Sequence, residues 1–140
     1  DALHAPKHVA QIVALAKSGA YDGVVFHRVI DGFMAQTGDV QYGKSGGDLS
    51  GAGMGGSNLP NIPAEFSDVP FARGTVGMAR SQDPDSANSQ FFIMFAPGDF
   101  LNGQYTVIGQ VIKGMDVVDA IQRGEPPATP DVMVKVTVQE

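Results

Sequence analysis

The residues between 38 and 61 match three motifs that carry chemistry in other proteins. Residues 38–45 read as a P-loop and residues 51–56 as G-x-G-x-x-G, patterns whose backbone amides bind phosphate where a helix begins. Residues 43–47 fit the nucleophile elbow, in which a serine stands between a strand and a helix. A helix must follow in each case, yet eight glycines lie in this stretch, and each costs about 1 kcal/mol in a helix interior. We therefore interpret all three matches as compositional, and nucleotide binding and serine hydrolysis are not expected.

His4 and His8 are four residues apart, so on a helix they would share a face in a spacing that metal sites use. No third ligand lies nearby in the sequence, and two histidines alone do not complete a coordination shell. We interpret this pair as solvated residues near the N-terminus and predict no metal site.

Arg28 is the one charged side chain in the apolar run of residues 24–30, which also contains His27. A charge in such a run can protect an edge strand against aggregation, and composition alone weighs this interpretation equally with a catalytic one. Neighbours in a strand point to opposite faces, so His27 and Arg28 should not face the same pocket. We therefore interpret His27 as structural.

Three long segments, taken in order, resemble one known family. Residues 26–39 read FHRVIDGFMAQTGD, residues 74–80 read GTVGMAR, and residues 86–93 read SANSQFFI. The first resembles the signature of the cyclophilin family of peptidyl-prolyl isomerases, and the other two resemble its second core motif in a bacterial variant. Residues 100–111 continue the match. The resemblance covers most of the chain from Pro6 onward.

This resemblance implies a role for ten residues that follow the common family pattern. Arg28 would be the catalytic arginine. The proline pocket would be lined by Phe33, Met34, Phe92 and Leu101. The remaining implied contacts are Gln36 and Gln90 on the substrate backbone, and Ala79, Arg80 and Ser81 where the family binds the residues that precede proline.

Two further binding positions depart from the commonest family pattern. Phe100 stands where many members have tryptophan, and Tyr105 where many have histidine. Neither change removes a catalytic group. An indole N–H is a donor that phenylalanine lacks, so we expect cyclosporin, the cyclic-peptide inhibitor of the family, to bind this chain but more weakly.

Isomerisation of an X-Pro bond suits these residue types. Its barrier of about 18–20 kcal/mol comes from amide resonance, so no covalent intermediate, proton abstraction or cofactor is required. An apolar pocket can hold the ring, and a fixed donor can meet the prolyl nitrogen, whose lone pair localises only in the twisted state. We expect a cofactor-free isomerase acting on proline-containing peptides and unfolded proteins. A proline-peptide binding module with little isomerase activity is the alternative.

The hydrophobic periodicity predicts the elements that must position these residues. Helices are expected over residues 6–17 and 115–122, and a long loop over 38–61. Runs rich in β-branched and aromatic residues, separated by turns, predict strands over 24–30, 33–37, 75–79, 90–95, 106–112 and 132–138, the first two joined as a hairpin.

This order predicts a mainly β fold in one domain spanning residues 1–140, an antiparallel cyclophilin-like β-barrel with two α-helices. Family domains usually open with a strand hairpin before the first helix, and only five residues precede Pro6. Residues 1–140 are therefore expected to be N-terminally incomplete, with unpaired edges that a longer natural chain or a neighbouring molecule would cover.

Composition limits the partners. The net charge of -6 disfavours binding to nucleic acid, because such affinity depends on neutralising phosphates. No apolar run approaches the roughly 18 residues of a membrane span, so no membrane association is expected. With no cysteine there is no disulfide or thiolate chemistry. A cytoplasmic location is expected; because the chain opens at Asp1, a periplasmic location after signal cleavage is the alternative.

Overall fold

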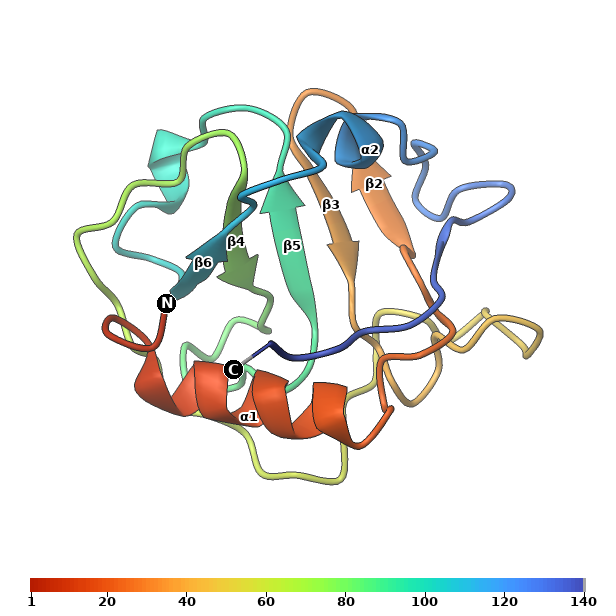
Figure 1. Ribbon diagram of the computed structural model, residues 1–140, viewed down its shortest axis with the longest axis horizontal. Coiled ribbons are helices and arrows are strands. Elements are labelled where there is room, and N and C mark those ends of the chain that lie inside the picture. Colours follow the sequence, from red (N-terminus) through yellow and green to blue (C-terminus); the bar gives the residue numbers. More distant parts are fainter. Residues whose placement is uncertain (140) are drawn as a thin grey trace.

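The computed structural model describes residues 1–139 and is mainly β, with seven short strands, two α-helices and one 3-10 helix (Figure 1). In chain order the elements are α1 (Pro6–Lys17), β1 (Val24–Val25), β2 (Arg28–Ile30), β3 (Met34–Thr37), β4 (Thr75–Met78), β5 (Phe91–Met94), η1 (Asp99–Leu101), β6 (Val107–Gln110), α2 (Met115–Asp119) and β7 (Val132–Met133). Five strands form one antiparallel sheet in the order β2-β3-β5-β4-β6, and β1 pairs with β7 in a second sheet. The predicted fold class, mainly β and antiparallel with two helices, is confirmed.

The sheets are not closed into the predicted barrel. β2 and β6 lie at the two edges of the larger sheet, and no strand precedes Pro6 in the part of the chain that the structure describes. The outer edge of β2 is met instead by a single bridge between Val29 and Gly124. No helix within residues 1–139 has the length and hydropathy needed to cross a bilayer.

The predicted strand over residues 24–30 is two strands, which belong to different sheets. The amides of Val25 and Phe26 donate to the carbonyls of Gly43 and Asp131, so this half of the run pairs with distant segments. Arg28 then begins β2, which forms the predicted hairpin with β3 in the register Ile30 opposite Met34. Long-range partners thus divide a run that local pattern presents as continuous.

Both α2 and β7 are shorter than predicted. α2 ends at Asp119 instead of residue 122, and β7 is Val132–Met133 instead of residues 132–138. After α2 the chain turns, because the amide of Gln122 donates to the carboxylate of Asp131 and not to the helix. The ends of both elements are set by loop contacts that periodicity does not report.

Gly77 in β4 has no side chain, and this leaves space for two stacked aromatic rings that pack against the strand. The rings of Phe71 and Phe92 stack with centroids 5.8 Å apart, and a Cβ on Gly77 would lie 2.6 Å from Phe71 and 2.7 Å from Phe92. These rings belong to one core cluster, whose buried members are Met34, Phe71, Phe92, Met94, Leu101 and Val107. Glycine is therefore required here by packing.

The glycine-rich loop that follows β3 is organised by Asp39, whose side chain is buried. Its Oδ1 accepts the amides of Gln41 and Tyr42, and its Oδ2 accepts those of Gly53 and Gly55. No helix begins within residues 46–74, and the lysine of the P-loop match, Lys44, donates Nζ to the carbonyls of Ala20 and Asp22. The interpretation of this match as compositional is confirmed.

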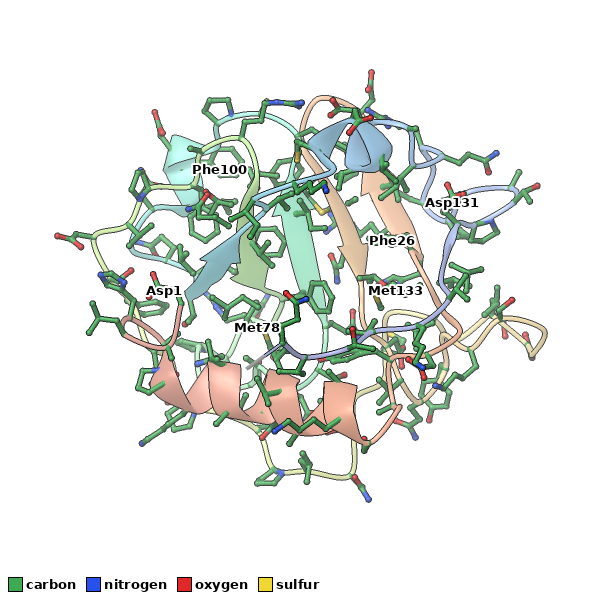
Figure 2. All side chains as sticks on the ribbon, in the orientation of Figure 1. Asp1, Phe26, Met78, Phe100, Asp131 and Met133 are labelled. Atoms are coloured by element: carbon green, nitrogen blue, oxygen red, sulfur yellow. The ribbon has the colours of Figure 1, made fainter. Side chains whose placement is uncertain are left out.

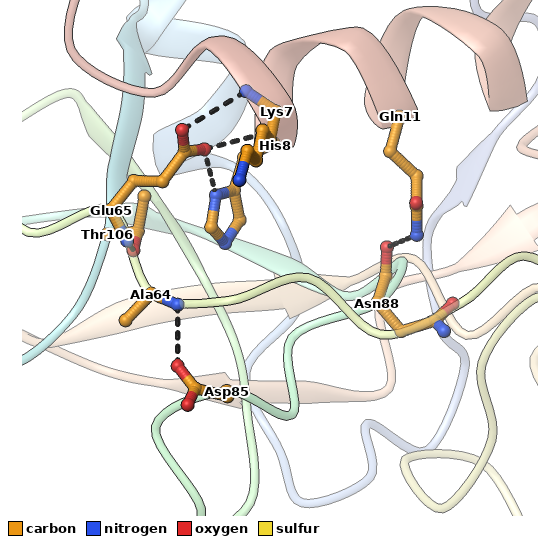
Figure 3. Close-up of polar contacts among 8 residues, drawn as sticks. All are labelled: Lys7, His8, Gln11, Ala64, Glu65, Asp85, Asn88 and Thr106. Carbon is orange, nitrogen blue, oxygen red and sulfur yellow. Dashed lines mark hydrogen bonds and ion pairs between the residues drawn. The ribbon is translucent and has the colours of Figure 1, made fainter.

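His8 corrects another prediction, because it is fully buried and not solvated. Its Nδ1 lies 2.5 Å from Oε1 of Glu65, which also accepts the His8 amide, while Oε2 accepts the amide of Lys7 (Figure 3). These amides belong to the first turn of α1, where a helix leaves N–H groups unsatisfied. Glu65 therefore caps α1 from a loop 57 residues away, a contact with no local sequence signal.

The Glu65 cap should make stability depend on pH. Burial raises the pKa of the Glu65 carboxyl, but the hydrogen bonds from His8 and Lys7 outweigh it and hold that pKa below its usual range. The resulting stabilisation is present above the ordinary carboxyl pKa, about 4.3, and is lost as pH falls through the lowered value. In urea unfolding, Glu65→Gln should be less stable than wild type at pH 7, and the difference should shrink toward pH 3. An equal difference at both pH values would contradict this account.

The space at Gly77 gives a second prediction. Gly77→Ala should lower the free energy of unfolding by about 1–3 kcal/mol, because an added methyl group must displace packed rings. The control is Gly109→Ala in β6, where a Cβ would meet nothing closer than 3.7 Å. Chemical denaturation measures both variants. Equal stability of the two would show that the rings at Gly77 move aside without cost.

Candidate functional site

A cavity of about 130 Å³ lies against the larger sheet and collects nine of the twelve residues that the sequence singled out. Six of its nine lining residues are apolar or aromatic, and two arginines and one amide complete the lining. The lining residues are Arg28, Phe33, Met34, Gln36, Ala79, Arg80, Phe92, Leu101 and Tyr105.

The strand register explains why these side chains meet. Arg28 on β2 is directly opposite Gln36 on β3, and Gln36 is opposite Phe92 on β5. Cross-strand partners share one face of a sheet, so the cation, the amide and the ring form a row over the cavity. Gly77 continues this row on β4, and its missing side chain leaves room for the Phe92 ring.

Arg28 presents a partly exposed guanidinium to the cavity and is held by two acceptors. Its Nη1 lies 3.3 Å from Oε1 of Gln36, and its Nε lies 3.1 Å from Oε1 of Glu125. Within residues 1–139, Nη2 donates to no protein acceptor. A permanent cation with unused donors therefore faces an apolar recess.

A chain of amides connects this arginine to the glycine-rich loop. Gln36 donates Nε2 to Oε1 of Gln90, and Gln90 donates Nε2 to the carbonyls of Gly53 and Gly55. Both the oxygen and the nitrogen of the Gln90 side-chain amide are thus hydrogen-bonded to other parts of the protein.

A second cavity, of about 280 Å³, adjoins the first and shares Gln36, Ala79 and Arg80 with it. Ser81 and Gln90, which the sequence also singled out, line this second cavity and not the first. Arg80 packs 4.3 Å above the Tyr105 ring and donates Nη2 to the carbonyl of Gln104. The remaining lining residues are Gly53, Met54, Gly55, Ser86, Asn88 and Ser89.

Phe100 is the one predicted site residue that lines neither cavity. It stands on η1 (labelled in Figure 2), with 71% of its surface exposed. The turn of η1 buries Leu101 in the first cavity and directs Phe100 outward, where its ring lies 5.6 Å from that of Phe33. Phe100 therefore lies beside the first cavity, in contact with one of its lining rings.

His27 lies outside both cavities, as its strand neighbourhood predicts. It is buried, neither ring nitrogen has a hydrogen-bond partner, and it packs beneath Gly53. Burial lowers the pKa of His27, although the nearby Asp39 carboxylate partly opposes this. This histidine is therefore neutral near pH 7 and supports the loop. Across residues 1–139, no three His, Cys, Asp or Glu side chains are grouped to hold a metal ion.

The sequence did not indicate Glu125 or the second-cavity residues that come from the glycine-rich loop. Glu125 is 97 residues from Arg28, and Gly53 and Gly55 contribute backbone carbonyls, which carry no side-chain pattern. Asn88 and Ser89 do lie within the second family-like segment. Their position in that segment was the one sequence feature that could have indicated Asn88 and Ser89 as site residues.

The chain matches a family model described as cyclophilin type peptidyl-prolyl cis-trans isomerase/CLD over residues 1–139. It is 61% identical over 142 residues to a probable peptidyl-prolyl cis-trans isomerase of Brucella abortus, covering 96% of this chain and 72% of that protein. The structure superposes on a crystal structure of a Hirschia baltica cyclophilin with a TM-score of 0.82 and 29% identity, covering 96% of this chain and 66% of that one. The structure also superposes on a Cryptosporidium parvum cyclophilin-type isomerase that was crystallised in the presence of the dipeptide Ala-Pro. The TM-score is 0.84 and the sequence identity 26%, and the match covers 99% of this chain and 89% of that one. The chain belongs to the cyclophilin-type peptidyl-prolyl cis-trans isomerase family.

Proposed function

We propose that Arg28 and the 130 Å³ cavity catalyse rotation about X-Pro bonds by stabilising the twisted amide without covalent chemistry. The observation that carries this proposal is the row of Arg28, Gln36 and Phe92 across three strands, which sets donors of a guanidinium beside an aromatic recess. Phe33, Met34, Phe92 and Leu101 hold the proline ring by burying its apolar surface.

The physical basis is a difference between the planar and the twisted amide. In the planar state the prolyl nitrogen lone pair is delocalised and is a poor acceptor, whereas twisting localises it. A donor that meets this nitrogen only in the twisted state lowers the barrier without tightening ground-state binding. The unused Nη2 of Arg28 is suited to this task because it is charged at every physiological pH.

One hydrogen bond does not account for the whole effect. Each tenfold acceleration requires about 1.4 kcal/mol of differential binding, so five decades require about 7 kcal/mol. A charge-assisted hydrogen bond contributes about 1.5–3 kcal/mol. Desolvation in the cavity and fixed orientation of the peptide supply the remainder.

The second cavity takes the residues that precede proline. Ala79 and Arg80 line both cavities and Ser81 the second, so a peptide with its proline in the first cavity extends along them. Gln36 lines both cavities and contacts the substrate backbone. Gln90 acts mainly through the loop it supports, because its amide is already bonded to Gln36, Gly53 and Gly55.

The substrates are proline-containing segments of unfolded or flexible chains, whose folding the enzyme assists. Both cavities are open at the surface, and an extended peptide reaches them more easily than a folded domain does. The Ala-Pro dipeptide present with the Cryptosporidium parvum relative supports this substrate class.

Substitution of Arg28 tests the proposed function. Arg28→Ala should lower kcat/KM by about 10²- to 10³-fold, as the loss of one transition-state donor does in other enzymes. Because Arg28 is partly exposed, the free energy of unfolding of the variant in urea should stay close to that of wild type. A protease-coupled assay or NMR exchange on an Ala-Pro peptide measures the activity. A variant that retains more than half of wild-type activity would refute the role, and peptide binding without faster exchange in the wild type would indicate a binding module.

The exposed Phe100 gives a prediction about inhibition. Cyclosporin should inhibit this isomerase, and Phe100→Trp should strengthen inhibition by about five- to 150-fold, because an indole N–H pairs an acceptor that phenylalanine leaves unsatisfied, at a cost of about 1–3 kcal/mol. The inhibition constants of the two proteins, measured on the same peptide, provide the comparison. Equal constants would show that the missing donor does not limit binding.

A further inference from the structure

Arg28 is held from two sides, by its own hairpin and by a segment 97 residues further along the chain. Gln36, its partner across the β2–β3 hairpin, accepts from Nη1, and Glu125 accepts from Nε at 3.1 Å. The side chains of Arg28 and Glu125 are 46% and 57% exposed, so close packing does not fix the guanidinium. Its orientation over the cavity therefore depends on these two hydrogen bonds.

The backbone holds Glu125 opposite Arg28. Val29 and Gly124 exchange two hydrogen bonds of 2.8 Å in an antiparallel bridge. In antiparallel pairing the residue after Gly124 lies opposite the residue before Val29, which places Glu125 beside Arg28. The ion pair thus follows from the register and not from a chance meeting of two mobile side chains.

Contacts on both sides of Glu125 fix this bridge. A Cβ on Gly124 would lie 2.6 Å from Cα of Pro127, and the φ angle of Gly124 is +145°, so this position requires glycine. Arg123 packs 4.1 Å above the Phe95 ring and pairs with Asp31. The Gln122 amide donates to Asp131 and closes the loop behind Glu125. The carboxylate is therefore presented from a rigid turn.

We propose that Glu125 is a positioning residue for Arg28, which orients the guanidinium so that Nη2 faces the twisted amide. This inference rests on the proposed catalytic role of Arg28. Glu125 acts by accepting from Nε, which restrains the long arginine side chain against rotation out of the cavity. A small misplacement of a catalytic group can cost up to about 100-fold in rate, whereas an exposed ion pair adds little to fold stability. Loss of Glu125 should therefore reduce catalysis and leave folding nearly unchanged.

Two substitutions at Glu125 and one matched control test this proposal. Glu125→Ala removes the acceptor and should lower kcat about five- to tenfold, with KM within twofold of wild type. Glu125→Gln keeps an oxygen acceptor and should retain at least half of wild-type kcat. The control is Asp119→Ala on α2, which removes the exposed ion pair with Arg73, outside both cavities, and should leave kcat unchanged.

A spectroscopic readout separates positioning from a structural role. In wild type and Glu125→Gln, the Nε–Hε resonance of Arg28 should be observed by 15N NMR as a hydrogen-bonded, slowly exchanging group. In Glu125→Ala this proton should exchange faster, while urea unfolding changes little.

The outcomes also separate this proposal from the one on which it rests. If Arg28→Ala keeps its activity, the proposed function fails. If Arg28→Ala is inactive but Glu125→Ala stays within twofold of wild type or exceeds it, the positioning role alone is wrong. An equal loss in Glu125→Gln and Glu125→Ala would overturn the hydrogen-bond mechanism in favour of a charge effect, and an equal loss in Asp119→Ala would show that the effect is not specific to Arg28.

Discussion

The glycine-rich loop beside the site depends most on the hydrogen bonds that the buried carboxylate of Asp39 accepts from backbone amides. No α-helix or strand lies between β3 and β4, so this segment must satisfy its backbone groups by other means. Asp39 accepts four backbone amides there, and Asn88 holds the next part by accepting from Ser57 and donating to the carbonyl of Leu59. Burial of a carboxylate is costly unless its acceptor sites are filled. The cost of burying this carboxylate is offset because its four hydrogen bonds order a loop that has no helix or strand to satisfy its backbone groups.

The ordered loop is connected to the row of Arg28, Gln36 and Phe92 through amide side chains. Asp39 fixes the amides of Gly53 and Gly55, Gln90 donates to the carbonyls of the same two glycines, and Gln36 connects Gln90 to Arg28. Hydrogen bonds in such a chain polarise one another, and each member restricts the next. The loop is thus a wall of the second cavity and also a support for the arginine. Stability of the loop and orientation of the guanidinium are coupled through one continuous set of contacts.

Local sequence patterns predicted the elements and residues whose structure depends on near neighbours in the chain. The helix at Pro6–Lys17 and the β2–β3 hairpin follow from periodicity and turn residues, and the family-like segments contain all nine residues of the first cavity. The errors share one cause, which is that they depend on partners far away in the chain. His8 is buried because Glu65 reaches it across 57 residues, and the run over residues 24–30 divides because Gly43 and Asp131 pair with its first half. Glu125 had no signal at all, since its role depends on the bridge at Gly124.

A reaction that moves no proton places unusual demands on this site. Its cation must be permanent, and its neighbours must not titrate near neutral pH. Arg28 meets the first condition, and His27, the nearest titratable base along the chain, is buried outside the cavities, where desolvation lowers its pKa and keeps it neutral. Glu65, whose carboxylate caps the first turn of α1, maintains the fold and lines neither cavity. The acid limit that Glu65 sets is therefore a limit on the stability of the fold and not on the chemistry of the site.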